Sequence, residues 1–410
     1  MSMSKKSSSS KYLRFLKALA DNTVESYFQS IRKYEEFHGI SIEELIDEAL
    51  DEQENQVPHH KLSLIDRLED FQEELINQGL VHGTIVHHLG MIKTIYHKNR
   101  VEIPYITPLN PKRTKRREYI EFKDILTKEE IKKALEHMRL PARARAITMA
   151  QGGLSNEECE HLTTRQFIDD LYKYHQCDDD VDALEWLSDE NHPVIWVARL
   201  TRIKTGKPYY ASIGAEAVNV IASAKLYEKG LKKNNGEIPD KLLNIHKNAF
   251  VRLCRSISNK LGLPKVAEES KFRSHNLRRF HATYIKGSAL SYEENSLITN
   301  AEIDEMQGRG KTNVQDTYIK TSPLRQKALY AKVMNNVSLF HKYDYAIVDG
   351  DVMVWIEDPT IETVKLRERV KKLEKTLAEK RDASDKVKAL REEMGDDAFN
   401  ELIGEILSVS

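Results

Sequence analysis

The chain has 410 residues, which is enough for two or three domains with their own hydrophobic cores. Its 63 lysines and arginines almost balance its 64 aspartates and glutamates, so the overall charge neither favours nor excludes a polyanionic partner. The three cysteines, Cys159, Cys177 and Cys254, lack the spacing of metal ligands. This argues against a zinc site or a disulfide framework and favours a reducing compartment. Because neither a signal peptide nor a membrane-spanning apolar run is recognisable, we expect a soluble cytoplasmic protein.

The first hundred residues predict a small helical domain. Residues 1–10 are rich in serine and lysine and are expected to form a disordered tail. Over residues 11–105, apolar side chains recur at helical spacing in two stretches. These are Val24, Tyr27, Ile31 and Tyr34, preceded by a possible cap at Thr23, and then Ile85, Leu89, Ile92 and Ile95.

Residues 106–125 predict a linker, because prolines are followed by a strongly basic run. Five of six consecutive residues are basic: Lys112, Arg113, Lys115, Arg116 and Arg117. Such a run is either a solvated loop or a segment that follows a phosphate backbone. Its position between two domains makes these five residues candidate contacts to DNA.

Residues 126–345 predict a second, mainly helical domain with a small β-sheet. TKEEIKKALEHM is a good helix start, and a further helix is expected to end at Gly152-Gly153. Residues 194–213 are β-rich, with a turn at Thr205-Gly206-Lys207, and residues 215–340 are expected to be helical throughout.

Residues 346–410 predict a C-terminal hairpin and a helical tail. The hairpin is expected to turn at Asp349-Gly350. The charged tail from 360 to 393 carries a short a/d seam of Leu366, Val370, Leu373 and Leu377. That seam fits either a short dimerising coiled coil or a helix that packs back on its own chain.

One short helix in the second domain gathers positive charge. In FRSHNLRRFHATYI, His275, Arg278 and Arg279 are spaced to share one helical face. Leu277, Phe280 and Tyr284 form the apolar stripe that faces the core. Two guanidiniums beside an imidazole suit the binding of an anion.

This helix, together with two other segments, resembles the tyrosine recombinase (phage integrase) family, particularly the integrases of archaeal viruses and plasmids. RSHNLRRFHAT resembles the family's H-x-x-R box, and Lys204 in IKTGK resembles the lysine of its β-turn. Gly308-Arg309, usually Gly-His in the family, stands nine residues before Tyr318, which is similar to the family's nucleophile. The N-terminal helical domain resembles the family's core-binding (SAM-like) domain.

The resemblance implies transfer of a DNA phosphodiester to Tyr318 with recombination between two DNA sites. Arg278 and Arg309 would bind the non-bridging oxygens, and His275 would share that task and exchange a proton with the nucleophile near neutral pH. Lys204 would protonate the departing 5′ oxygen. A 3′-phosphotyrosine keeps the bond energy, so no cofactor or metal is expected. His281 and Arg279 are expected to pack or contact the backbone.

The first box of the family departs from its usual pattern. It normally reads G-L-R with an acidic residue after it, but here it reads Gly153-Leu154-Ser155, with Glu158 in place. Either the arginine has moved or the clamp is lost. Arg202 is the preferred candidate for a moved arginine, because on a β-strand it would point to the same side as Lys204. Arg143 and Arg145 are less attractive candidates, because the sequence does not fix which face of their helix they occupy.

The functional hypotheses follow from these two explanations. The first is a site-specific recombinase of a mobile element, a free monomer or dimer that forms a homotetramer on double-stranded attachment sites. The alternative is a catalytically impaired, DNA-binding protein of the same fold. A type IB topoisomerase and a coiled-coil scaffold are more distant possibilities. No membrane partner is expected, and the protein would associate with the nucleoid when bound to DNA.

Overall fold

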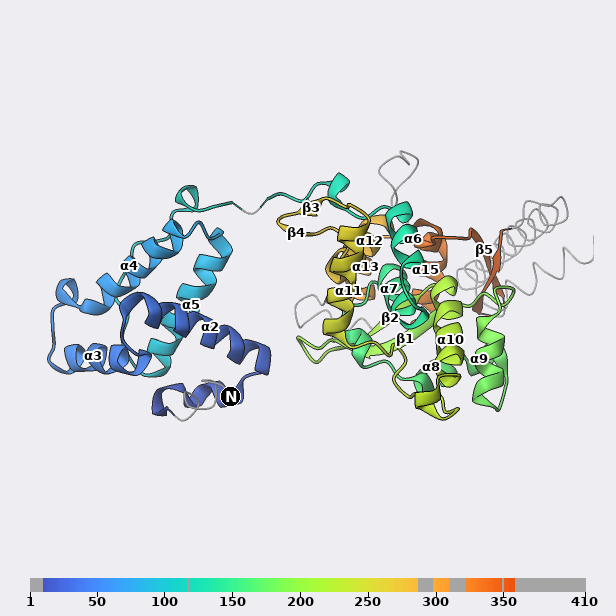
Figure 1. Cartoon of the computed structure of the whole chain (residues 1–410), viewed down its shortest axis with the longest axis horizontal. Coiled ribbons are helices and arrows are strands. Elements are labelled where there is room, and N and C mark those ends of the chain that lie inside the picture. Colours follow the sequence, from blue (N-terminus) through green and yellow to red (C-terminus); the bar gives the residue numbers. More distant parts are fainter. Residues whose placement is uncertain (1–9, 117, 287–297, 310–321, 349, 358–410) are drawn as a thin grey trace, which may run out of the picture. The chain divides into compact units, whose positions relative to one another are not determined.

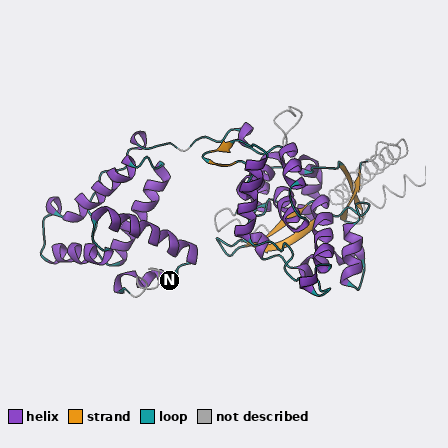
Figure 2. Cartoon of the chain, viewed as in Figure 1, coloured by secondary structure: helices purple, strands orange, loops and turns teal. Residues whose placement is uncertain are grey.

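The computed structural model describes residues 10–116, 118–286, 298–309, 322–348 and 350–357. The chain divides into two compact units, residues 1–119 and 120–410 (Figure 1). Helices dominate the described residues, and the strands form three separate two-stranded antiparallel sheets (Figure 2). The prediction of a mainly helical chain with small β-structure is confirmed.

The first unit is a helical bundle. Its elements are η1 (Lys11–Ala18), α2 (Asp21–His38), α3 (Ile42–Glu54), η2 (His59–Lys61), α4 (Ser63–Asn77), α5 (His82–Lys98) and η3 (Pro111–Arg113). The predicted periodicity marks the core, since Ile31, Tyr34, Ile92 and Ile95 are buried. Helix α3 begins with a reciprocal capping box between Ser41 and Glu44.

Part of the predicted linker packs on this first unit. Ile106 and Leu109 lie against its core, and Lys115 forms a β-bridge with Val81. Arg113 donates two hydrogen bonds of 2.7 Å to the carboxylate of Glu73. At least one charge of the basic run is therefore paired within the first unit.

The second unit surrounds the buried helix α7 (Leu140–Gly152), which packs against α10, α12 and strand β2. The helical elements before it and after it up to β4 are η4 (Phe122–Asp124), α6 (Lys128–Glu136), η5 (Glu158–Glu160), α8 (Thr164–His175), α9 (Asp180–Ser188), α10 (Ala215–Lys229), η6 (Lys232–Asn234) and α11 (Lys247–Lys260). The later helices are α12 (Ser274–Tyr284), α13 (Asn300–Met306) and α15 (Pro323–Val337).

Two of the three hairpins precede helix α12 in the chain. Strands β1 (Trp196–Thr201) and β2 (Pro208–Ile213) pair from Trp196↔Ile213 to Thr201↔Pro208. Strands β3 (Lys265–Val266) and β4 (Glu269–Ser270) form a short hairpin in a region predicted to be entirely helical, so that prediction was wrong there.

The C-terminal hairpin, β5 (Tyr343–Val348) and β6 (Asp351–Ile356), forms where it was predicted. Asp351 anchors it to the second unit. Its carboxylate accepts hydrogen bonds from Lys173 at 2.9 Å, Tyr174 at 2.6 Å and Lys327 at 3.0 Å. The hairpin therefore packs on α8 and α15, whereas the predicted tail from 358 to 410 lies outside the described residues.

Candidate active site

Helix α12 places Arg278 at the centre of the site. Leu277 and Phe280 are fully buried in the core of the second unit, as the predicted apolar stripe requires. Arg278 itself is only 4% exposed, which requires that its charge be paired. Arg279 lies beside it and donates to the side chain of Asn276 at 3.2 Å.

The partner of Arg278 is Glu158, a buried carboxylate that also binds Arg202. Glu158 Oε2 lies 3.2 Å from Arg278 Nη1, and Glu158 Oε1 lies 2.8 Å from Arg202 Nη1. Ser155 orients the carboxylate, because its backbone N–H donates to Oε2 at 2.7 Å while its hydroxyl accepts from the Glu158 N–H at 3.2 Å. One carboxylate thus holds two guanidiniums side by side.

A second acceptor shared by the two arginines is the main-chain carbonyl of Gln307. It accepts from Arg278 Nη2 at 2.5 Å and from Arg202 Nη1 at 3.3 Å. Gln307 follows helix α13, and its side-chain amide lies 2.9 Å from Nδ1 of the buried His281. Gln307 therefore connects the end of α13 to both arginines and to α12.

Gly308 and Tyr209 form the next layer of the site. Gly308 has φ +62, and a Cβ at this position would lie 2.7 Å from a ring carbon of Tyr209. Glycine is therefore required both by the backbone conformation and by the close approach of the ring. Arg309 follows immediately and is exposed, with Nη1 3.9 Å from Asp304 Oδ1.

The positive charge of the site acts on His275. Partial burial, together with the charges of Arg279, Arg273, Arg278 and Arg309, lowers the pKa of His275 to about 4, although much of the residue remains exposed. At neutral pH the imidazole is therefore uncharged in the free protein. The imidazole can accept a proton as a neutral base. The expectation that His275 titrates near pH 7 would require an anion beside the arginines, because a negative charge there would raise its pKa.

The pKa of Glu158 is also lowered, but in a carboxyl group this shift favours the charged form. Burial would raise the pKa of this carboxyl, but the Ser155 N–H and the charge of Arg278 outweigh burial, and the pKa lies below its ordinary value. The carboxylate therefore stays ionised and keeps both arginines in place at neutral pH.

The turn between β1 and β2 carries Arg202 and Lys204. β1 ends at Thr201, so the argument that both residues share one side of a strand was wrong. Instead the Arg202 N–H donates to the Lys207 carbonyl at 2.8 Å, and Gly206, with φ +67, donates to the Arg202 carbonyl at 2.8 Å. The turn points Arg202 inward to Glu158 and leaves Lys204 exposed.

The structure thus brings Arg202 and Arg278 together, with His275 and Arg309 close enough to act on one another electrostatically. Tyr318 and Arg117 lie outside the described residues. Of the other basic residues near the boundary, Lys112 and Arg116 are exposed.

Sequence reasoning gave no role to Gln307 or Tyr209 and treated Glu158 only as part of a pattern. Ser155 to Glu158 has the S-x-x-E spacing of a capping box, and that spacing is a signal that Glu158 turns back toward Ser155. Nothing local marks Gln307, whose contribution is its backbone carbonyl.

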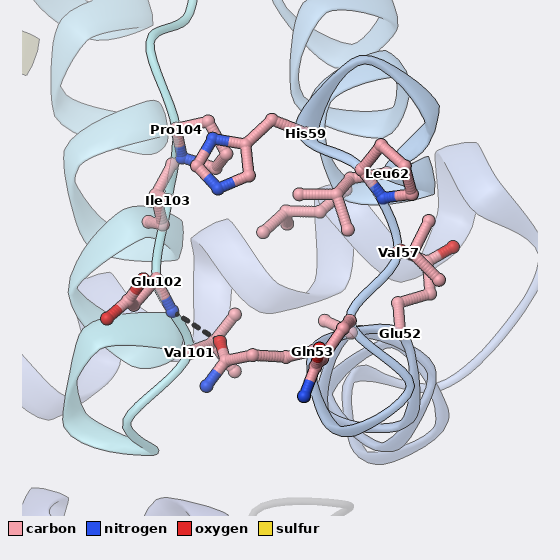
Figure 3. A pocket seen from close by; sticks show the side chains of 13 residues that line it. Glu52, Gln53, Val57, His59, Leu62, Val101, Glu102, Ile103 and Pro104 are labelled. Carbon is pink, nitrogen blue, oxygen red and sulfur yellow. Dashed lines mark hydrogen bonds between the residues drawn. The ribbon is translucent and has the colours of Figure 1, made fainter.

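A separate cavity of about 380 Å³ lies in the first unit (Figure 3). Its polar side chains are mainly those of Glu52, Gln53, His59 and Glu102. Glu52 accepts from the Ser63 N–H, and Gln53 accepts from the Glu102 N–H at 2.9 Å. Two carboxylates in its lining make this cavity unsuited to a phosphate, and none of the predicted site residues lines it.

Two further properties concern the described residues only. Within them, no cluster of three or more histidine, cysteine, aspartate or glutamate side chains is arranged to hold a metal ion. Each of their helices is too short or too polar to cross a membrane.

No protein-family model matches the chain, and no curated protein matches it. Several solved structures are similar to it, including two Xer recombinases and a phage integrase. XerA recombinase is 14% identical over 77% of this chain and 94% of that one, with a TM-score of 0.30. XerH site-specific recombinase bound to difH substrate is 16% identical over 62% of this chain and 67% of that one, with a TM-score of 0.38. The integrase of mycobacterium phage Brujita is 14% identical over 82% of this chain and 92% of that one, with a TM-score of 0.29. Scores of this size do not by themselves assign an activity.

Proposed function

We propose that the chain is a tyrosine site-specific recombinase that cleaves and rejoins double-stranded DNA. The single observation that carries this proposal is the pairing of Arg202 with Arg278 on Glu158. The motif lacks its first arginine at Ser155, and a guanidinium from the β1–β2 turn occupies the neighbourhood of the second one. Two arginine forks are what a phosphodiester under attack requires.

In the proposed reaction, the phenolic oxygen of Tyr318 attacks the scissile phosphorus and the bond from phosphorus to the 5′ oxygen breaks. Lys204 gives a proton to that oxygen, so the products are a 3′-phosphotyrosine and a free 5′ hydroxyl. Arg202, Arg278 and Arg309 stabilise the charge on the non-bridging oxygens, and neutral His275 takes the phenolic proton. Attack by the 5′ hydroxyl of another strand reverses these steps and completes the exchange.

DNA, in this proposal, also contacts the basic run. Lys112, Lys115 and Arg116 would lie along the phosphate backbone, together with Arg117. Arg113 would have to leave Glu73 to take part. The resemblance to integrases of archaeal viruses and plasmids suggests a mobile element of that kind as the source, with four protomers on two synapsed sites.

The test is a nicked suicide DNA that carries the attachment site, taken from the ends of the element that encodes the protein. We expect a denaturant-resistant protein–DNA adduct from the wild type and none from Tyr318→Phe. Arg202→Ala is expected to lower the rate of adduct formation by about a hundred- to a thousandfold, with DNA binding retained.

The matched control is Arg199→Ala, which removes an exposed arginine from strand β1 of the same hairpin and should leave the rate unchanged. An Arg202→Ala variant that forms the adduct as fast as Arg199→Ala would exclude the moved arginine.

The second candidate is a DNA-binding protein without catalysis. It is favoured by one observation, that both arginines are already paired with Glu158 in the absence of DNA. A wild-type protein that shifts the suicide DNA in a gel but forms no adduct would establish this alternative.

A further inference from the structure

Tyr209, on strand β2, has a buried hydroxyl that makes no hydrogen bond to any described residue. The residue is 8% exposed, and its ring packs against Gly308, directly after the Gln307 carbonyl that binds both arginines. A buried donor without an acceptor costs stability, and most buried hydroxyls in folded proteins are paired. An unpaired hydroxyl at this position therefore calls for a role.

The surroundings of this hydroxyl determine its chemistry. Burial, the negative charge of Glu158 and the close approach of the hydroxyl to that carboxylate raise the pKa of Tyr209 above its ordinary value, while Arg278 and Arg202 act in the opposite direction. The hydroxyl is thus next to Glu158 without forming a hydrogen bond of good geometry to it. The phenol thus stays protonated at neutral pH and is an available O–H donor close to Glu158. It is too buried to act as a nucleophile on DNA.

The two oxygens of Glu158 differ in how well they are supplied with donors. Oε2 accepts from the Ser155 N–H and from Arg278, whereas for Oε1 the donor is Arg202. Arg202 is also the more accessible guanidinium, since its side chain is 17% exposed against 5% for Arg278. Arg278 is moreover held by the Gln307 carbonyl at 2.5 Å.

Engagement of a phosphate by Arg202 would therefore leave Oε1 buried and without a donor. We propose that Tyr209 is a positioning residue whose hydroxyl takes over Glu158 Oε1 when Arg202 turns from the carboxylate to the scissile phosphate. This inference rests on the proposed function and specifies how the site changes between its free and DNA-bound states. In this proposal the Tyr209 hydroxyl forms its hydrogen bond only when DNA is bound.

The experiment compares the wild type with Tyr209→Phe, which removes only the hydroxyl. At saturating suicide DNA, we expect the rate of adduct formation to fall about ten- to a hundredfold, the effect of leaving one buried acceptor without a partner. The free energy of unfolding of the DNA-free protein should be equal to or higher than that of the wild type, because no hydrogen bond is lost. Loss of rate without loss of stability is a result that a merely structural tyrosine would not give.

Two matched variants serve as controls. Tyr210→Phe changes the neighbouring tyrosine of β2, whose side chain alternates to the other side of the strand, and should leave the rate unchanged. Tyr330→Phe removes a buried hydroxyl that does donate, to the Gln151 carbonyl at 2.9 Å, and should lower stability. It shows that the unfolding measurement detects such a loss.

A Tyr209→Phe protein that forms the adduct at the wild-type rate overturns the inference and leaves the proposed function intact. A Tyr209→Phe protein that is destabilised like Tyr330→Phe also overturns it, because the hydroxyl would then be paired in the free state. Absence of any adduct from the wild type overturns the proposed function, and the inference falls with it.

Discussion

Glu158 holds the two arginines of the site in place, and the substitution Glu158→Gln tests this most directly. The carboxylate side chain is 1% exposed and contacts Arg202 at 2.8 Å and Arg278 at 3.2 Å. The amide keeps the shape of the side chain but removes its charge, so that two guanidiniums are left close together with no counter-ion. Breaking a buried ion pair by removing one partner costs about 3–5 kcal/mol. We therefore expect the free energy of unfolding of the second unit to fall by about 3 kcal/mol or more.

Urea denaturation followed by tryptophan fluorescence measures this unit alone, since Trp186, Trp196 and Trp355 are the only tryptophans and all lie after residue 119. Glu129→Gln is the matched control, because Glu129 pairs with Lys132 at 2.9 Å but is 72% exposed. Exposed pairs contribute about 0–1 kcal/mol. If Glu158→Gln were no more destabilising than Glu129→Gln, the view that one buried carboxylate organises both arginines would be refuted.

Two further predictions concern stability. Burial lowers the pKa of His281 to about 3, so the unfolded chain binds its proton near pH 6.5 while the folded chain does not, and stability falls with acidification. Between pH 7.5 and 5.5 this histidine should account for about 1.4 kcal/mol of the loss in urea experiments, and His281→Asn should remove that part of the pH dependence; an unchanged slope would contradict the assignment. In the β3–β4 turn, Ala267 has a φ of 51, so Ala267→Asn should raise the free energy of unfolding by about 0.5 kcal/mol in the same assay. A decrease would show that Ala267 is not a source of strain.

Helical periodicity predicted the parts of the fold that depend on neighbouring residues. Leu277 and Phe280 are buried and Arg278 lies beside them on α12, because side chains three and four residues apart share a helical face. The β3–β4 hairpin escaped prediction because Ala267 and Glu268 occupy turn positions where glycine or asparagine is the usual signal.

The candidate site was predicted as a set of residues but not as an arrangement. Arg202 and Arg278 meet through Glu158, which lies 44 positions before one and 120 before the other. No local pattern encodes such a contact, and the strand argument placed Arg202 by the wrong geometry. In the linker, likewise, the basic run showed charge but not the pairing of Arg113 with Glu73, 40 residues away.

Ser155 and the arginine of the turn act on the same carboxylate. The Ser155 hydroxyl accepts from the Glu158 N–H, and the Ser155 N–H donates to Glu158 Oε2. This reciprocal cap leaves Glu158 Oε1 available to Arg202 of the β1–β2 turn. An arginine side chain at 155 has no acceptor and could not form the hydroxyl half of the cap. Ser155 therefore orients the carboxylate, and the carboxylate holds Arg202 next to Arg278. The site thus contains two adjacent guanidiniums, although Gly153-Leu154-Ser155 supplies neither of them.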